Sequence, residues 1–527
     1  MAADEPCILA IDLGTSGPKV ALVTVSGRVL GCTTSPTQLH LLPGGGAEQD
    51  PDDWWRAIVT ATNALHAKQL TSRDAVIGVC CTAQWAGTVA VGADGEHLRN
   101  AIIWMDTRGA PEVQALTGGL ISVEGYAAHK LAKWIRRTGG APSRAGKEPV
   151  AHILWLRRHE PRTYERTRCF LEPKDWLNLR LTGELAASHD SIALHWSTDN
   201  RNIEKIAYDD ELLALNTLPR DKLPPLRRAV DVLGTVRPEV ADALGIPASA
   251  KVVMGTPDVQ SAAIGSGAVH DGKGHVYLGT SSWVTCHVAF KKTDLFRNMA
   301  SLPSALPGRY LVANAQETAG ACVSWLRDAV LFGNDALGEH TPPEDFFPRF
   351  EALAGAAPVG SDKLIFVPWL IGERSPVADA TVRGAFFNQQ LSTTRSHLAR
   401  AVLEGVAYNT RWLFGAVERF VGAPMSSLRA IGGGASSALW CQILADVLDR
   451  EIAQVESPVQ CNARGAGLLG ALGLGRIRVD DIPERVAVAR RFQPRREHRR
   501  AYDELFSAYL DLYRATKGIF AKLNAQS

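Results

Sequence analysis

The chain has 527 residues, 46% of them hydrophobic and 21% charged, a globular composition in a chain long enough for more than one domain. Its 57 basic and 55 acidic side chains leave a formal charge of +2, so nothing favours nucleic acid or an anionic membrane, and we expect a small-molecule partner. The nine cysteines include no CxxC pair, the N-terminus is acidic, and no apolar segment reaches membrane-spanning length. We therefore expect a soluble cytoplasmic protein without disulfides or a structural metal.

Strand and helix patterns alternate over the first hundred residues, which predicts a mixed α/β region. Ser26-Gly27 has the composition of a hairpin turn between two of the strands. The predicted elements, in chain order, are strands at 8–11, 20–25 and 28–34, a helix at 54–70, a strand at 75–81 and a hairpin around 89–95.

Further along the chain, two segments rich in proline, glycine or charge, 138–148 and 218–225, predict surface loops. Helical spacing of apolar residues predicts a core helix over 396–421. The arginine-rich segment 485–500 could be a nucleic-acid patch, but we interpret it as a solvated loop and helix face.

The segment ILAIDLGTSGPKVALV places an acid and a cluster of small residues between two predicted strands. A turn needs only one or two small residues, so Gly14, Thr15 and Ser16 indicate a ligand: their N–H groups and hydroxyls can approach phosphate oxygens closely. Asp12 can hold a hydrated Mg²⁺ through water, and Lys19 adds a positive charge. The alternative is an ordinary tight turn with hydroxyl capping.

The tetrapeptide Leu-Gly-Thr-Ser recurs at 278–281, which is 265 positions after its first occurrence and about half the chain away. Both copies lie between predicted strands, so we infer two similar domains, each presenting a turn to a cleft between them. Gly279, Thr280 and Ser281 form the second candidate turn, and two facing turns can hold a polyphosphate. Simple hydroxyl capping is again the alternative.

A third glycine cluster follows an apolar strand that ends at Ile431 and precedes a helix. Gly433, Gly434 and Ser437 lie in this turn, whose position at a helix N-terminus suits close packing of a nucleotide. The sequence GGGASS lacks the spacing of a dinucleotide fingerprint, and the chain contains no P-loop motif.

Several motifs together resemble those of the FGGY family of carbohydrate kinases, and within it the xylulose kinases. The similar segments follow the family order over nearly the whole chain. They are IDLGTSGPKV at 11–20, EQDPDDWW at 48–55, AIIWMDTR at 101–108, PKDWLNLRLTGE at 173–184, YLGTSS at 277–282, IGERSP at 371–376, GAFFNQQ at 384–390 and IGGGASS at 431–437.

The resemblance implies an α/β fold of two ribonuclease-H-like domains, of the actin and heat-shock-chaperone superfamily, with a catalytic cleft between them. We place the first domain, with the sugar site and the first phosphate turn, at 1–262. The second, ATP-binding domain is placed at 263–527, and its last helix could pack back on the first domain.

The resemblance also implies ATP-dependent phosphorylation of a terminal hydroxyl of a ketose, with ATP and Mg²⁺ bound. Asp258, in GTPDVQSAAIGSG, corresponds to the family's catalytic base and would remove the hydroxyl proton. From its position after Pro257 alone, Asp258 would be interpreted as a helix N-cap. Trp325 is similar to the family's tryptophan near the adenine.

The sugar site shows both matches to the family and departures from it. Gln84, Trp85, Trp104, Asp106 and Arg108 lie in segments that resemble the family's sugar-binding ones. The departures are Gln84-Trp85-Ala86-Gly87 where xylulose kinases usually have Gln-Met-His-Gly, Val259 where they have asparagine, and His152 where they have lysine.

Because of these departures, three functions stay open. The first is a xylulose-kinase-like enzyme, the second a kinase for another pentulose or an alditol, and the third a sugar- and ATP-binding regulator with little turnover. Retention of Asp258 and both phosphate turns favours an enzyme over the regulator. A homodimer also stays open, because interfaces in such folds leave no readable sequence pattern.

Overall fold

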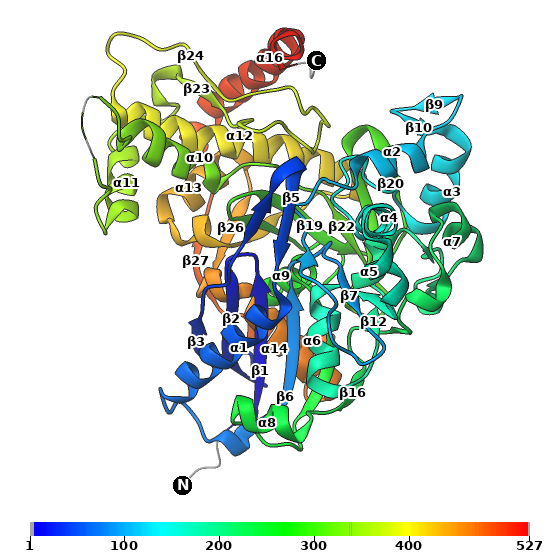
Figure 1. Ribbon diagram of the computed structural model, residues 1–527. Helices are drawn as coiled ribbons and strands as arrows, with labels where there is room; N and C mark the ends of the chain where they lie inside the picture. The colour runs from blue at the N-terminus through cyan, green and yellow to red at the C-terminus, as the bar shows by residue number, and fades with distance from the viewer. Residues whose placement is uncertain (1–4, 337, 339, 525–527) are drawn as a thin grey trace.

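The computed structural model describes residues 5–336, 338 and 340–524. Two β-sheets packed with helices form its two domains, and Figure 1 shows the blue strands of the first sheet below the long yellow helix of the second domain, residues 395–421. The first sheet has the order β16-β17-β6-β1-β2-β3, and the second β20-β21-β22-β19-β18-β25-β26-β27. The strands of the first are β1 (Cys7–Gly14), β2 (Gly17–Thr24), β3 (Val29–Thr34), β6 (Val76–Ala83), β16 (Val232–Thr235) and β17 (Lys251–Pro257). Those of the second are β18 (Gly274–Leu278), β19 (Ser282–Val288), β20 (Thr293–Asp294), β21 (Met299–Pro303), β22 (Tyr310–Ala313), β25 (Ser427–Ile431), β26 (Glu451–Val455) and β27 (Val488–Phe492).

The two sheets repeat one topology. In the first, the antiparallel hairpin β1–β2 is extended on one side by β6 and β17 in parallel and then by antiparallel β16. In the second, the hairpin β18–β19 is extended by β25 and β26 in parallel and then by antiparallel β27. On the other side, β3 and β22 pair antiparallel with the hairpins. The two similar domains inferred from the repeated tetrapeptide are therefore present.

The predicted helices exist with somewhat different ends. The helix expected at 54–70 is α1 (Pro51–His66), which begins earlier because the Asp50 carboxylate caps it by accepting from Asp52 N at 2.9 Å. The helix expected at 396–421 is α12 (Arg395–Val421), and its apolar side chains join the core of the second domain. Its Thr394–His397 capping box could not be recognised as one, because the third residue is histidine instead of glutamate.

Several helices inserted after the first strands gather at the right of Figure 1. They are α2 (Ala110–Thr117), α3 (Ala128–Thr138), α4 (Pro149–His159) and α7 (Asp210–Asn216). The predicted loop at 138–148 connects α3 to α4, and the one at 218–225 holds only a short 3₁₀ turn. Within the described chain, no helix combines the length and apolar character needed to cross a bilayer.

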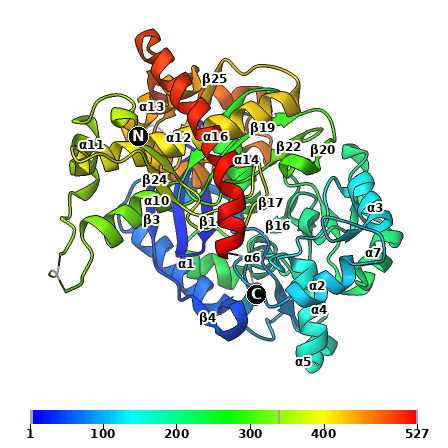
Figure 2. The same ribbon diagram turned by 90° about the horizontal axis from the view of Figure 1, so that it is seen from above.

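Two predictions for the C-terminal region are corrected. The segment 485–500 is not only solvated loop and helix, because β27 forms the edge strand of the second sheet and Arg495 pairs with the buried Asp446 at 2.6 Å. The last helix, α16 (Arg499–Asn524), packs on the second domain and not back on the first: Figure 2 shows it across α12, and Tyr509 packs against Tyr408 of α12.

Two helices that follow the central strands cross between the domains. The first, α9 (Asp258–Ser266), follows β17, and the second, α14 (Cys461–Gly473), follows β26 and packs on β1, β2 and β6 of the first sheet. Glycine is required where they touch: a Cβ on Gly265 would lie 1.9 Å from Cys461 O, and one on Gly465 would lie 1.9 Å from Ser261 O. The helices therefore interlock the two domains through their backbones.

We expect Gly465→Ala to lower the free energy of unfolding by about 1–3 kcal/mol, because the added methyl group forces α9 and α14 apart. Gly518→Ala in α16 is the matched control, since a Cβ there meets no atom within 4 Å and alanine favours a helix. Denaturant unfolding measures both. Equal midpoints for Gly465→Ala and the unchanged protein would show that the helix crossing is not tight.

Candidate active site

The first phosphate turn connects β1 to β2 and is held by polar side chains from the first domain. Thr15 Oγ1 donates to Gln84 Oε1 at 3.1 Å and accepts from Trp104 Nε1 at 2.9 Å. Gln49 Nε2 donates to Thr15 O at 2.7 Å. Gly17 has a φ of 135°, and a Cβ on it would lie 2.1 Å from Ser35 O, so this position requires glycine. The Ser16 side chain is exposed, which leaves its hydroxyl accessible to a ligand.

The second phosphate turn, between β18 and β19, is supported by the second domain. Gly279 N donates to Ser281 O at 3.0 Å, and Gly279 O accepts from Gly320 N at the start of α10 (Gly320–Trp325). Ala319 N donates to Thr280 O at 2.8 Å, while the Thr280 side chain is exposed. The backbone is therefore fixed and the hydroxyl stays available.

The third glycine cluster packs against the second phosphate turn. Gly432 has a φ of 90°, and a Cβ on it would lie 2.6 Å from Leu278 O, while one on Gly434 would lie 2.9 Å from the Leu278 Cβ. A Cβ on Gly433 would meet nothing within 4 Å, so this glycine faces open space. Ser437 Oγ accepts from Trp440 N at 3.1 Å and caps α13 (Ala438–Leu448). The hydroxyl of Ser437 therefore serves as a helix cap.

Two carboxylates lie where the domains meet. Asp12, on β1, is buried and faces Lys19 across the β1–β2 hairpin, with Nζ 3.6 Å from Oδ2. The side chain of Asn462 in α14 acts to lower the pKa of Asp12. Asp258 is the first residue of α9, and its Oδ1 accepts from Val259 N at 2.8 Å. Asp258 is thus within the first turn of the helix, and Pro257 occupies the N-cap position that we had considered for it.

Burial raises the pKa values of both acids, and the charge of Asp12 further raises the pKa of Asp258. Burial raises the pKa of Asp12, which Lys19 partly offsets. The pKa of Asp258 is raised to about 7, first by burial and then by the negative charge of Asp12. A carboxyl group with this pKa can exchange a proton near neutral pH, as a general base must.

The predicted sugar turn adjoins the first phosphate turn. Gln84 N donates to Leu13 O at 2.8 Å, and Gln84 Nε2 donates to Gln49 Oε1 at 2.7 Å. The Trp85 indole N–H donates to Ser191 O at 2.9 Å, so its polar atom is already satisfied within the protein. Ala86 has a φ of 64°, and Glu172 Oε2 accepts from Gly87 N at 2.9 Å. Sequence reasoning missed Gln49 and Glu172, because neither lies in the turns that they support.

Of the other predicted sugar residues, Trp104 is exposed, whereas Asp106 and Arg108 are hydrogen-bonded within the protein. Trp104 is 40% exposed, which leaves much of its ring accessible. Asp106 is buried, accepts from Ala47 N at 2.8 Å and accepts from Arg108 Nε at 2.9 Å, so these two charges neutralise each other. Burial lowers the pKa of His152 to about 4, so this ring is neutral, and its Nδ1 lies 3.1 Å from Thr88 Oγ1.

Trp325, expected near the adenine, is at the C-terminal end of α10. Its ring stacks on Phe366 at 6.0 Å between centroids and on Phe386 at 6.4 Å. The indole is only partly buried. An aromatic surface is therefore present in the second domain, which also contains the second and third glycine turns.

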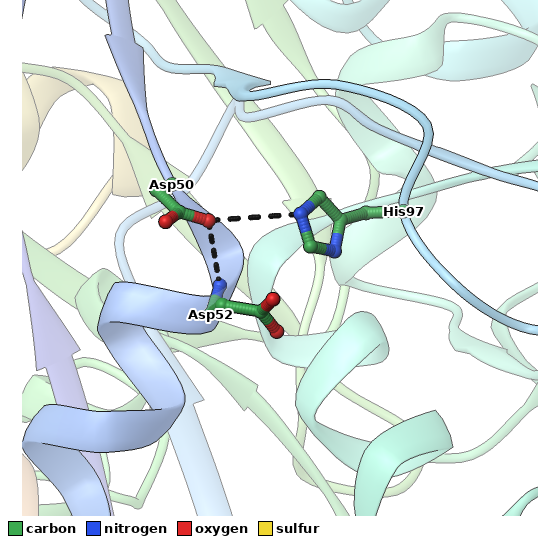
Figure 3. Close-up of side chains that lie close together, drawn as sticks. All are labelled: Asp50, Asp52 and His97. Carbon is green, nitrogen blue, oxygen red and sulfur yellow. Dashed lines mark hydrogen bonds and ion pairs between the residues drawn. The ribbon is translucent and has the colours of Figure 1, made fainter.

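Asp50, Asp52 and His97 come close together at the start of α1, as Figure 3 shows. Three such side chains could hold a metal ion, yet each short contact has a structural explanation. Asp50 Oδ1 caps α1 and lies 3.6 Å from His97 Nε2. We assign no ion to this cluster, and the acid predicted to bind Mg²⁺ is Asp12.

The comparison with known proteins identifies the class. Residues 7–265 match the N-terminal domain of the FGGY family of carbohydrate kinases, and residues 274–474 match its C-terminal domain. The chain therefore belongs to this family and is a carbohydrate kinase, a phosphotransferase that acts on sugars. The family resemblance and the fold class predicted from the sequence are both confirmed.

Within the family, the chain is similar to xylulose kinases. It is 30% identical to the xylulose kinase of Escherichia coli (strain K12), over 94% of this chain and 99% of the relative. The xylulose kinase structure from Rhodospirillum rubrum matches with a TM-score of 0.81 and 26% identity, covering 98% of this chain and 99% of the other. A gluconate kinase structure from Lactobacillus acidophilus has the same fold, with a TM-score of 0.84 and 24% identity over 99% and 100% of the chains.

Glu172 provides a test of the sugar turn. We expect Glu172→Ala to raise the KM for the accepted sugar about tenfold and to leave the KM for ATP unchanged, because the Gly87 amide loses its buried acceptor. Steady-state kinetics with each substrate varied in turn measure both constants. Glu172→Gln keeps an acceptor oxygen and should stay close to the unchanged enzyme. Equal rises in both KM values would instead indicate general damage to the fold.

Proposed function

We propose that this carbohydrate kinase transfers the γ-phosphoryl group of ATP to a terminal hydroxyl of a small ketose. Xylulose is the first candidate, and another pentulose or an alditol is the alternative. The observation that supports the proposal most is the position of Asp12 and Asp258 at the junction of the two domains, each of which contributes a turn of small residues. The similarity to xylulose kinases supports the choice of sugar class.

In this proposal, Asp258 is the general base. Its Oδ1 is oriented by the Val259 amide, so the carboxylate can take the proton of a sugar hydroxyl while the hydroxyl oxygen attacks phosphorus in line. The P–O bond to the leaving group breaks as the new one forms, and ADP departs with the released electron pair. A positioned base contributes about 10²–10⁴-fold to such a rate.

The two phosphate turns hold the triphosphate in this proposal. Ser16 from the first turn and Thr280 from the second have exposed side chains, and the backbone N–H groups of Gly14 and Ser281 would add donors. Gly279 closes the second turn, because its own N–H donates to Ser281 O. Asp12 would hold a hydrated Mg²⁺ through water, and this ion neutralises phosphate charge when bound. Oxygen donors suit this hard cation, and Asp12 supplies a buried one. Lys19 would add a further positive charge for the phosphates.

The nucleotide base lies in the second domain in this proposal. Gly433 faces open space beside the second phosphate turn, and Gly434 keeps the chain close to Leu278, so the third glycine turn can approach a nucleoside. Trp325 is the candidate neighbour of the adenine. Residues 1–262 and 263–527 are the proposed sugar and nucleotide domains. We also propose that the protein is located in the cytoplasm. ATP is available there, and the nine cysteines are all thiols, as the reducing cytoplasm favours.

The wall near Trp85 is less polar than the family's sugar turn. The indole N–H is used by Ser191 O, Ala86 offers only a methyl group, and Val259 beside the base is aliphatic. A sugar hydroxyl that faced this wall would lose a partner, at a cost of about 1–3 kcal/mol. This supports a substrate with fewer hydroxyls toward the wall than xylulose has, or one in a different orientation.

Replacing Asp258 tests the reaction. We expect Asp258→Asn to lower kcat by about 10²–10⁴-fold with little change in the KM for ATP, since the amide cannot accept the proton. Coupled detection of ADP across a panel of ketoses and polyols measures this. For the unchanged enzyme, kcat/KM should fall as the pH drops below about 7, because protonation of Asp258 removes the base. A profile that is flat from pH 5 to 8 would mean that another group accepts the proton.

Trp85→Met combined with Ala86→His tests the substrate assignment. We expect this double variant to use xylulose with a kcat/KM about tenfold higher than the unchanged enzyme, because an imidazole restores one polar contact in the sugar site. The same panel of sugars measures it, with Trp55→Met as a control on the surface of α1. No gain would show that Val259 and His152 decide the specificity. Sugar-induced domain closure without any turnover would favour the regulator.

A further inference from the structure

We propose that Tyr277 is a further residue of the phosphoryl-transfer site, and that its hydroxyl donates a hydrogen bond to an oxygen of the transferring phosphoryl group. The inference rests on the proposed function and deepens it. Tyr277 is the residue two positions before Gly279 on strand β18, outside the Gly-Thr-Ser turn itself.

The position of the phenol relative to the second phosphate turn is the first argument. An ideal Cβ on Gly279 would lie 2.3 Å from the Tyr277 hydroxyl oxygen and 2.3 Å from its Cε1. The phenol therefore lies directly against the Cα of Gly279, and any larger residue there would push it away. The hydroxyl is thus at the turn that is proposed to hold phosphate oxygens.

The ring cannot easily leave this position. Tyr277 and Trp283 are cross-strand partners in the β18–β19 hairpin, and their rings stack with centroids 3.9 Å apart and planes 9° apart. The Trp283 indole N–H donates to His275 Nε2 at 3.1 Å, and this hydrogen bond holds the Trp283 ring of the stack in place. The hydroxyl is therefore preorganised before any ligand binds, as effective electrostatic stabilisation requires.

The negative charges of Asp258 and Asp12 act on the Tyr277 hydroxyl. The pKa of Tyr277 is raised to about 12, first by burial and then by the charges of Asp258 and Asp12. The phenol therefore keeps its proton and can only donate it to an acceptor at neutral pH. Within the described residues the hydroxyl has no hydrogen-bond partner, and the side chain is only partly buried, so a ligand can reach it.

These positions select the ligand atom. The charge of the proposed base, Asp258, acts on the phenol, and the second phosphate turn touches the phenol at Gly279. In the proposed reaction, the transferring phosphoryl group lies between the base and this turn. Its oxygens are anionic and accept hydrogen bonds, and they carry more charge near the Tyr277 hydroxyl during transfer than bound sugar does.

Tyr277→Phe tests the proposal because it removes the hydroxyl and keeps the stacked ring. We expect kcat to fall about 10–100-fold, with the KM values for sugar and ATP unchanged within about threefold, as for a hydrogen bond to a charged group made in the transition state. Tyr208→Phe is the matched control: its hydroxyl donates to Pro224 O at 2.9 Å in a loop of the first domain, so activity should be unchanged.

A binding measurement separates this contact from a structural role. With Mg²⁺ and sugar present, calorimetry should show that Tyr277→Phe binds ADP as the unchanged enzyme does, but binds ADP with aluminium fluoride, a mimic of the transferring group, about tenfold more weakly. If Tyr277→Phe binds the mimic as tightly as the unchanged enzyme, or keeps its kcat, the role of Tyr277 is wrong. The proposed reaction still stands in that case, provided that Asp258→Asn strongly lowers turnover. If Asp258→Asn leaves turnover intact, the proposed reaction fails and not only the role of Tyr277.

Discussion

The proposed chemistry depends on two carboxylates that lie where the domains meet: Asp12, which is buried, and Asp258, which is partly exposed. Asp258 is the first residue of α9, and the side chain of Asn462, the second residue of α14, acts to lower the pKa of Asp12. Burying two like charges close together is costly, and a single lysine, itself 44% exposed, offsets only part of that cost. The partial positive charge of the helix ends, the Asn462 side chain and the Val259 amide offset a further part of that cost. The raised pKa values record what remains uncompensated.

Holding both helix ends at the acids requires the helices to cross closely. The glycines at the crossing let the backbones of α9 and α14 touch, and Ser261 Oγ donates to Asn462 O at 2.8 Å beside them. Because α14 follows a strand of the second sheet and packs on the first, the second domain supplies part of the surroundings of Asp12, an acid of the first domain. The positions of the two acids therefore depend on the close crossing of α9 and α14, and this crossing also joins the two domains.

Secondary structure and turns set by neighbouring residues could be predicted from the sequence. Side-chain contacts between residues far apart in the chain could not. The hairpins, α1 and α12, and the duplicated turns follow from residues close in the chain, such as Ser26-Gly27 or the repeated Leu-Gly-Thr-Ser. By contrast, Glu172 supports Gly87 from 85 positions away, and Asn462 reaches Asp12 from the other half of the chain. No periodicity or composition reveals such contacts, because they exist only once the sheets are packed.

The predicted site residues show the same limit. Asp106 and Arg108 were expected in the sugar site from the family resemblance, and the structure pairs Arg108 with Asp106 and with Glu48, a contact that the motifs alone did not predict. The segment 485–500 was misjudged because its arginines mask the strand at 488–492, whose partners lie on β26. Charge on an edge strand is a common protection against pairing, and it hides the strand pattern.

The duplicated turns have different neighbours, although each connects two antiparallel strands of its own sheet. The first turn is bonded through Thr15 to Gln84 and Trp104, which lie in the sugar segments, while the second is bonded to α10 and packs against the third glycine turn. A change at Gln84 in the sugar turn can therefore reach the first phosphate turn through the hydrogen bond between Gln84 and Thr15. Gln84, which makes that bond, matches the family, whereas Trp85 and Ala86 beside it depart. The chain can thus alter its sugar contacts at two positions while the coupling between sugar and phosphate stays in place.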